Sequence, residues 1–586
     1  MTTASLRVKH PFQLGLSPAT SFWEMRVAPF LDKHFVALCL SLIGIACTRV
    51  IATYNCLSLT TDEPDDFTSG LEFLSRHAYT YNIAHPPLSR LFQALGPYLA
   101  GARLPNQPGS LLHPLDLIAL TGHVERTIFL MRLGNLPFFI LACLVVCGWS
   151  WHAFGKPIAV VATCLYTLLP APLADAGLAT PDMALGATVG AAVFAAVLWV
   201  EKPTWLRALI MGVFTAAACL SRFTALGYIP GCLGLALSFF LVVERPGWRC
   251  ILVLAKLRVA TLAFAALTAA TLIWAGYWFS AGRFPSHRLG LGYLPPAPEF
   301  FAGVMTSLTH NTGGHGSYLL GHFSWEGWWC YFPIALAVKT PIAFLVLAAL
   351  GFYACLRNRF HLLYLLPVAF TLGILLPALR SHIDIGIRHI EPIWVGLSII
   401  ASLGLRQLLL WARTGVASML SGGALLTWMV ISVACHHPDY VAYFNAFAGK
   451  TPEQFLVDSN YDWGQDLKLL AERLNRLRVQ NVSLAITQDA GYGPPTNYAY
   501  LQDWYGLPHA QKVSTCVPLP GWNVVSTTVE RSLSHWAGTR YYRGPGMPAA
   551  WYELIAPTER IGPLLLYDIP EGSKLRSENC DSSFVP

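Results

Sequence analysis

The sequence predicts a polytopic α-helical membrane protein with about eleven transmembrane helices and a small C-terminal α/β domain. Two observations support this fold class. Of the 586 residues, 54% are hydrophobic and only 12% are charged, whereas soluble domains carry about 25% charged residues. Apolar stretches long enough to cross a hydrocarbon core of roughly 30 Å also recur along the chain as far as about residue 434.

The first apolar stretch runs from about His34 to Tyr54 and is too long for the core of a signal peptide. No small-residue cleavage site precedes it, so we expect it to be retained as a transmembrane helix. Ten further stretches follow, of which the pair meeting near Arg222 is short. They lie near 128–150, 157–171, 182–200, 206–221, 225–243, 259–279, 333–355, 361–379, 387–405 and 411–434.

Lys and Arg side chains gather in alternate loops, for example at Lys33, Lys156, Lys202, Arg245 and Arg357. The positive-inside rule assigns these loops and the N-terminus to the cytoplasm. The loops 55–126 and 280–332 and the tail from about 435 are then expected to face outward. The net charge of +7 is therefore a topology signal, and we expect no nucleic-acid partner.

The tail divides the chain into a membrane part, 1–434, and a soluble part, 435–586. Leucines recur at helical spacing between Asp466 and Leu477, which predicts an amphipathic helix. Strand-like runs follow at Val482–Thr487, Val524–Val529 and Pro563–Asp568. Cys516 and Cys580 lie in this outward tail, and whether they form a disulfide is open.

Four carboxylates follow the first apolar stretch, where the chain leaves the lipid. Asp62 and Glu63 suit a general base at the boundary between lipid and water, and we take them as catalytic candidates. The alternative is a helix start, since Asp is a good N-cap and Glu and Pro suit a first turn. Asp65 and Asp66 are interpreted as a solvated face.

Two further candidates begin helices on the same outer side. His85 precedes two prolines and an apolar face typical of an interfacial helix, and it is a candidate for substrate binding. Asp182 follows Thr180-Pro181 at the start of the fourth apolar stretch, where an ionisable side chain is costly and tends to mark function. Helix capping is the alternative for both residues.

Cations lie at the outer ends of several stretches, where the positive-inside rule disfavours them. A bound lipid phosphate would explain them better than isolated snorkelling side chains. The candidates for binding this phosphate are Arg222, Lys339, Arg388 and His389.

Two other regions carry polar candidates. The loop from His310 to Gly316, with His322 and Glu326 beyond it, holds three histidines and a carboxylate, but their spacing matches no strict metal-binding pattern. Metal binding there is left open. In the tail, Asp458, Asp462 and Trp463 belong to a group of aromatic, amide and carboxylate side chains suited to an acceptor sugar. Packing and capping of the helix at Asp466 is the alternative.

Together these motifs resemble the membrane-embedded glycosyltransferases of the GT-C superfamily. They are most similar to bacterial relatives of the protein O-mannosyltransferases and of the aminoarabinose and oligosaccharide-core transferases. The resemblance rests on the stretches around Asp62, His85, Asp182, Lys339 and Arg388, and on the tail sequence 458–467. Two departures are Arg222, where we expect Lys, and Glu391, where an apolar residue is usual.

The resemblance implies a GT-C enzyme in the bacterial plasma membrane, with interfacial helices in the first outer loop and a periplasmic or extracellular C-terminal domain. Such an enzyme would move a hexosyl or pentosyl group from a polyprenyl-phosphate carrier to a glycan, lipid or protein acceptor. Asp62 would act as general base with inversion, and a divalent metal is not excluded. The alternatives are a transporter or flippase of lipid-linked sugars, and an inactive scaffold of envelope glycan assembly.

Overall fold

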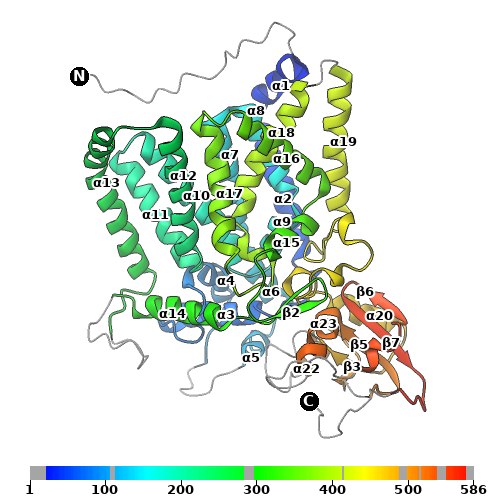
Figure 1. The fold of residues 1–586 in the computed structure, drawn as a ribbon. Helices are drawn as coiled ribbons and strands as arrows, with labels where there is room; N and C mark the ends of the chain where they lie inside the picture. Colours follow the sequence, from blue (N-terminus) through cyan, green and yellow to red (C-terminus); the bar gives the residue numbers. More distant parts are fainter. Residues whose placement is uncertain are drawn as a thin grey trace.

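The structure, a computed structural model, describes residues 21–105, 113–282, 296–411, 415–486, 498–513, 517–536 and 550–575. Cys516 and Cys580 lie outside these residues, so their disulfide stays an open prediction. The chain is mostly helical, with upright helices above a layer of short helices and a small sheet (Figure 1).

Six helical stretches in the described ranges are long and apolar enough to cross a membrane. They are α2 (Phe35–Thr53), the stretch Val124–Phe154 that joins α6 (Val124–Leu133) to α7 (Leu136–Phe154), α10 (Asp182–Glu201), α12 (Ala225–Glu244), α13 (Trp248–Ala275) and α18 (Ile393–Trp411). Shorter apolar helices are α11 (Trp205–Ser221), α17 (Leu362–Ala378) and α19 (Gly415–Ala434). At the N-terminus, η1 (Trp23–Val27) and α1 (Ala28–Lys33) precede α2.

Two predicted spans are bent rather than straight. Helices α8 (Lys156–Thr167) and α9 (Pro170–Gly177) meet at 61°, and α15 (Tyr331–Lys339) and α16 (Ile342–Arg357) meet at 119°. A proline lies at each break, Pro170 in the first turn of α9 and Pro341 before α16. Proline has no backbone N–H and disfavours helical geometry in the residue before it, which explains both breaks. With these pairs, each of the eleven predicted stretches corresponds to a helix or a bent pair.

Short helices lie across one end of the upright helices, which we call the loop face (bottom of Figure 1). They are α3 (Glu63–Arg76), α4 (Pro87–Leu99), α5 (Pro114–Ala119) and α14 (Pro298–Gly313). The predicted interfacial helix after His85 is α4, and two prolines precede or open it. A hairpin of β1 (Ser317–Leu319) and β2 (His322–Ser324) follows α14.

The C-terminal part forms the predicted small α/β domain. Its five strands have the order β4-β3-β5-β7-β6, with β4, β3 and β5 parallel and β5, β7 and β6 antiparallel. The strands are β3 (Asn481–Ala485), β4 (His509–Lys512), β5 (Gly521–Ser526), β6 (Glu559–Ile561) and β7 (Leu564–Ile569). Around them lie α20 (Leu467–Arg476), α22 (Tyr498–Tyr505), α23 (Thr527–Trp536) and η6 (Trp551–Glu553). The helix and the three strands predicted in the tail correspond to α20, β3, β5 and β7.

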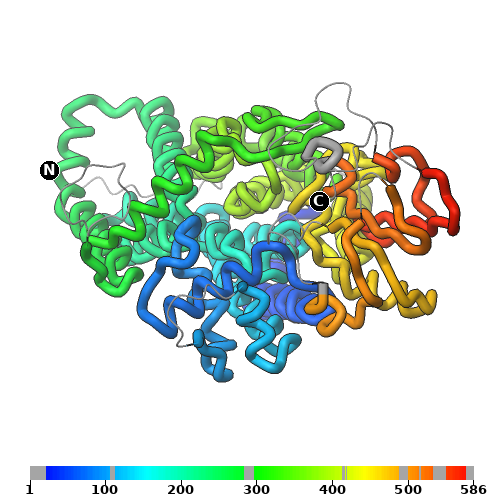
Figure 2. The backbone as a smooth tube through the Cα atoms, turned by 90° about the horizontal axis from the view of Figure 1, so that it is seen from below, coloured from blue at the N-terminus to red at the C-terminus, as the bar shows by residue number. Residues whose placement is uncertain are grey.

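The segment between α19 and α20 joins the sheet to the membrane helices through η3 (Ala446–Ala448), η4 (Pro452–Gln454) and η5 (Asp458–Asn460). Asn445 Nδ2 donates to the carbonyls of Ala337 and Thr340, at 2.6 and 2.7 Å. These carbonyls lie at the α15–α16 break, so Asn445 satisfies backbone groups that the bend leaves without helical partners. Seen from the loop face, the C-terminal part lies beside the first loop (Figure 2), where Leu59 N donates to Tyr505 Oη.

Candidate active site

Two aspartates and two arginines meet at the loop face, on segments far apart in the sequence. Asp62 directly precedes α3, Asp182 opens α10, Arg222 ends α11, and Arg388 lies in η2 (Ile387–Ile390) before α18. We call these four residues the Asp–Arg cluster. They were all predicted as site residues, and the structure brings them together.

Arg388 is the centre of the cluster. Its Nη1 lies 2.9 Å from Asp62 Oδ2 and 3.3 Å from Asp182 Oδ2, while its Nε donates to Ser459 Oγ at 3.1 Å. The guanidinium also lies 4.0 Å from the ring centroid of Trp463. These contacts fix the plane of the guanidinium and bury most of it. A Cβ on the nearby Gly386 would clash with Ser459 Oγ, which explains a glycine at this position.

Asp182 is completely buried and lies between two guanidinium groups, since Arg222 pairs with its Oδ1 and Arg388 with its Oδ2. Its helix has Pro181 at the N-cap position, and no side chain caps it. The carboxylate therefore holds two arginines at the membrane boundary, where two unpaired cations would be costly.

Asp62 is the one carboxylate of the cluster with an open side, because 37% of its side chain is exposed. It occupies the N-cap position of α3, but its side chain makes no capping hydrogen bond and is paired with Arg388. Capping therefore does not account for this side chain. An exposed carboxylate beside buried cations can take a proton from a group that approaches from water.

Glu63 has a different environment from Asp62, although both were predicted as catalytic. It is completely buried and forms a two-point ion pair with Arg132 at 2.8 Å. Backbone N–H groups of Thr60 and Ala179 also donate to it at 2.8 Å. Burial raises the pKa of this carboxyl, but Arg132 and the backbone donors outweigh burial and hold the pKa below its ordinary value. These contacts describe a structural ion pair, with its oxygen atoms turned away from solvent.

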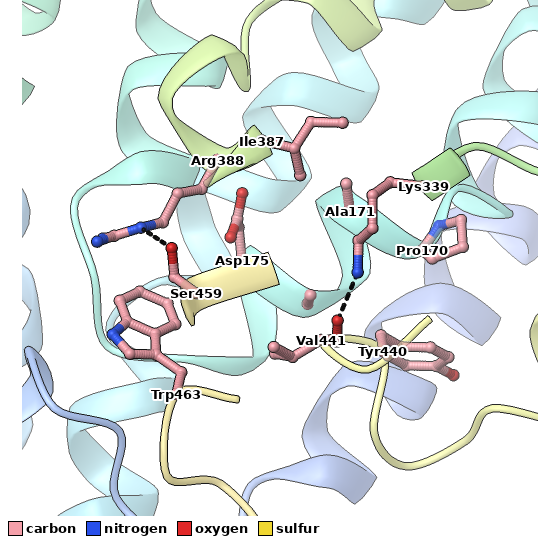
Figure 3. A pocket seen from close by; sticks show the side chains of 11 residues that line it. Pro170, Ala171, Asp175, Lys339, Ile387, Arg388, Tyr440, Val441, Ser459 and Trp463 are labelled. Atoms are coloured by element: carbon pink, nitrogen blue, oxygen red, sulfur yellow. Dashed lines mark hydrogen bonds between the residues drawn. The ribbon is translucent and has the colours of Figure 1, made fainter. Parts of the chain in front are cut away.

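Lys339 ends α15 and points into a small pocket beside the cluster (Figure 3). Its Nζ donates to the carbonyls of Val441 and Asn460, at 2.7 and 2.5 Å, and lies 4.3 Å from the ring centroid of Phe444. The pocket is lined mainly by the short halves of the two bent pairs, by η2 and by the segment after α19. Its lining residues are Pro170, Ala171, Ala174, Asp175, Lys339, Ile387, Arg388, Tyr440, Val441, Ser459 and Trp463.

The three tail candidates reach the site to different degrees. Trp463 packs its ring against Arg388 and accepts a hydrogen bond from Thr61 N at its carbonyl. Asp458 adjoins the same region, and burial raises its pKa to about 7 against the opposing effect of Arg388. Asp462 is buried and accepts from Thr528 N of α23 at 3.3 Å. None of the three caps α20, whose N-cap residue is Asp466.

The two predicted histidines lie close to the arginines. His85 makes no capping contact with α4, and burial together with Arg222, Arg90 and Arg388 lowers its pKa well below the ordinary value. Its imidazole is therefore neutral near pH 7. His389 Nε2 is buried and has no hydrogen-bond partner among the described residues.

The histidine loop does not form a metal site in the described part of the chain. His310 and His315 have ring centroids 5.4 Å apart, but no group of three or more His, Cys, Asp or Glu side chains that could hold a metal ion occurs there. The aspartates of the cluster face arginines instead. Participation of a divalent metal stays an open prediction.

Several residues that shape the site were missed from the sequence. Ser459 orients Arg388, and Arg132 pairs with Glu63. Arg132 lies near the start of the predicted apolar stretch 128–150 and was not recognised as a site residue. Asp175 was also missed, although a carboxylate among the apolar residues 170–178 is a signal that could have identified it.

No protein-family model matches the chain, and no curated protein does. Among solved structures, the chain is similar to ArnT from Cupriavidus metallidurans bound to undecaprenyl phosphate, at 13% identity and a TM-score of 0.46, over 90% of this chain and 97% of that one. It is similar to the archaeal oligosaccharyltransferase AglB from Archaeoglobus fulgidus in complex with an inhibitory peptide and a dolichol-phosphate, at 12% identity and a TM-score of 0.46, over 84% of this chain and 70% of that one.

Proposed function

We propose that this protein is an integral membrane glycosyltransferase that moves a sugar from a polyprenyl-phosphate carrier to an acceptor hydroxyl at the loop face. The observation that carries the proposal is the Asp–Arg cluster. A partly exposed carboxylate, Asp62, lies against the buried guanidinium of Arg388 at the end of the membrane helices. A base open to water beside cations at the lipid boundary suits transfer from a lipid phosphate to a water-side acceptor.

The cations supply a site for the donor phosphate. Arg388 and Arg222 reach the cluster from η2 and α11, and Lys339 reaches the adjoining pocket from α15. A guanidinium matches two phosphate oxygens at once, and charge-assisted hydrogen bonds of this kind are strong where water is excluded. His389 follows Arg388 and is the fourth candidate for this site. The prenyl chain would lie between the apolar helices.

The reaction needs one proton transfer and one displacement. The acceptor oxygen attacks the anomeric carbon of the sugar as Asp62 takes the hydroxyl proton. The bond between that carbon and the phosphate oxygen breaks, and its electron pair leaves with polyprenyl phosphate, which gains one negative charge. Arg388 and Arg222 stabilise this charge as it develops. Attack from the face opposite the phosphate inverts the anomeric centre.

The tail and the first loop form the acceptor side of the proposal. Trp463 fixes Arg388 from the tail, and Asp458 and His85 adjoin the cluster. Neither the tail nor the first loop identifies the acceptor, so the proposal covers glycan, lipid and protein hydroxyls. The transferred sugar is either a hexosyl or a pentosyl group. The loop face would be the outer face of a bacterial plasma membrane, with the N-terminus in the cytoplasm.

The proposal is tested with purified protein and a panel of polyprenyl-phosphate monosaccharides, following release of polyprenyl phosphate by mass spectrometry. We expect wild-type protein to release it with at least one donor when an acceptor mixture from cell envelopes is added. Asp62→Asn should lower the rate by about 10²- to 10⁴-fold, as expected for loss of a general base.

Glu125→Gln is the matched control, because Glu125 is a loop-face carboxylate with 71% of its side chain exposed. It should retain wild-type rates. Near-wild-type turnover by Asp62→Asn would remove Asp62 as the base. Movement of intact donor across vesicles without release of polyprenyl phosphate would contradict transfer and favour a transporter.

A further inference from the structure

Two buried carboxyl groups, those of Asp175 and Glu391, adjoin each other beside the pocket and have no role in the reaction described above. Asp175 lies on α9, the short half of a bent pair, and Glu391 directly follows η2. Only 5% of Asp175 and 1% of Glu391 is exposed. Glu391 is also the carboxylate that departs from the resemblance seen in the sequence.

The pair is poor in hydrogen-bond donors. Asp175 Oδ2 and both carboxyl oxygens of Glu391 are buried and accept no hydrogen bond of normal geometry, and the groups that face them are the partner carboxyl and the Trp394 indole beside Glu391. Buried polar atoms in proteins nearly always have partners, and those without one need a specific explanation. Two adjacent carboxyl groups require either a shared proton or a ligand that supplies donors.

The pocket indicates which part of a donor would meet the pair. Asp175 lines it together with Lys339 and Arg388 (Figure 3). Phosphate oxygens are acceptors, so they pair with the two cations and are repelled by a carboxylate. The sugar joined to that phosphate carries O–H groups, which are donors. Cations beside carboxyl acceptors therefore suit a sugar phosphate better than a phosphate alone, and the pocket, with a volume of about 20 Å³, must widen to admit the sugar.

We propose that Asp175 and Glu391 form a sugar-recognition pair that accepts hydrogen bonds from the donor sugar and selects a sugar-loaded carrier over the bare one. This inference rests on the proposed function, because it takes the carrier phosphate to bind Lys339 and Arg388. The substrate class it defines is a polyprenyl-phosphate sugar with at least two free hydrogen-bond donors on the ring edge that faces α9. After transfer, the bare product loses these contacts and is released.

Equilibrium binding to the full-length protein in lipid nanodiscs tests the pair. The probes are undecaprenyl phosphate and a panel of undecaprenyl-phosphate hexoses and pentoses. The measured quantity is the dissociation constant of the bare carrier divided by that of the sugar-loaded carrier. Wild type should bind at least one sugar-loaded probe more tightly than the bare carrier. Asp175→Asn and Glu391→Gln should each lower this ratio about tenfold, the effect of losing one charge-assisted hydrogen bond.

The two variants should bind bare undecaprenyl phosphate at least as tightly as wild type, because they remove negative charge near the cations. Glu125→Gln should leave both constants unchanged. An unchanged ratio in both variants, or an equal loss of both ligands, would overturn the recognition pair and leave the proposed function standing. Failure of wild type to bind any carrier would contradict the proposed function itself. O-methylated sugar probes on wild type give the same test without a substitution, since they should bind no better than the bare carrier.

Discussion

At the scale of single residues, Arg388 and Arg222 differ in how much of the cluster depends on them. Arg388 contacts Asp62, Asp182 and Ser459 and packs on Trp463. Arg222 has one ion pair, with Asp182. A planar guanidinium can make several directed contacts at once, whereas a lysine ammonium supplies one compact charge. The two arginines should therefore respond differently to the same substitution.

We expect Arg388→Lys to lower turnover by about 10²-fold or more, because the oxyanion-type stabilisation of the leaving phosphate is lost. Arg222→Lys should retain most activity, since a lysine preserves the positive charge that pairs with Asp182. The measurement is polyprenyl phosphate release by both variants at equal amounts of folded protein. Equally small losses would show that positive charge without guanidinium geometry maintains the cluster, and equally large losses would show that both positions need a guanidinium.

Asp458 gives a pH-dependent prediction. Burial raises its pKa to about 7, so the side chain is neutral below this pH and ionised above it. An added negative charge near Arg388 opposes a bound phosphate. Affinity for undecaprenyl phosphate should therefore fall roughly three- to tenfold between pH 6 and pH 8 in the wild type. Asp458→Asn should lack this fall and show only the change caused by the second ionisation of the phosphate itself, and a variant that keeps the full pH dependence would assign it to another group.

The sequence predicted the residues of the Asp–Arg cluster but not their pairing. Asp62, Asp182, Arg222 and Arg388 were recognisable because each is an ionisable group at the outer end of an apolar stretch. Asp62 and Glu63 could not be told apart, since adjacent residues of a helix start share the same local signals. Their difference comes from Arg132, a residue 69 positions away from Glu63 that only the folded chain brings to it.

At the scale of elements, the Glu63–Arg132 pair joins four parts of the chain. Arg132 of α6 donates to Glu63 at the start of α3 and to the carbonyls of Tyr54 and Leu57 after α2, at 2.7 and 2.9 Å. Glu63 in turn accepts a hydrogen bond from Ala179 N, in the loop before α10. The pair thus positions the segment that carries Asp62 against the membrane helices.

Removing one partner of this pair should cost more than removing both charges. Arg132→Met leaves Glu63 buried and unpaired, for which about 3–5 kcal/mol of stability is the usual loss. The double variant Glu63→Gln/Arg132→Met should be more stable than Arg132→Met alone, because no buried charge remains. Thermal unfolding in detergent gives both values. A double variant less stable than Arg132→Met would contradict the ion-pair interpretation, and the exposed pair Arg476→Met/Glu472→Gln serves as control.

The bends in the two bent pairs were not predicted from the sequence. The stretch 333–355 was predicted as one straight span, and the stretch 157–171 covers α8 and only the start of α9. Pro170 and Pro341 marked the breaks, but the partners that make a bend tolerable came from elsewhere, as when Asn445 reaches Ala337 and Thr340. Asp175 and Lys339 lie on the short halves of the bent pairs, so the bends place both residues in the lining of the pocket.

At the scale of the whole molecule, the predicted fold class is confirmed. It could be predicted because it depends on amino-acid composition and on the periodicity of apolar residues. Long apolar stretches, an amphipathic tail helix and three strand-like runs each became an element. Contacts between the tail and the membrane part were not predictable, since they join residues such as Gln465 and Ser58 through backbone hydrogen bonds. The Asp–Arg cluster lies at one end of the molecule. Transfer at the outer face therefore requires that this end of the molecule face outward.

The orientation can be measured with cysteines that the chain already contains. Cys56 and Cys435 are exposed and follow α2 and α19 towards the loop face, whereas Cys250 is exposed in the first turn of α13, at the other end of the helices. With the loop face outward, a membrane-impermeant maleimide should label variants retaining only Cys56 or only Cys435 in intact cells. The variant retaining only Cys250 should be labelled only after the membrane is opened. The reverse pattern would put the Asp–Arg cluster in the cytoplasm and contradict transfer at the outer face, and labelling of all three after permeabilisation is the control for reactivity.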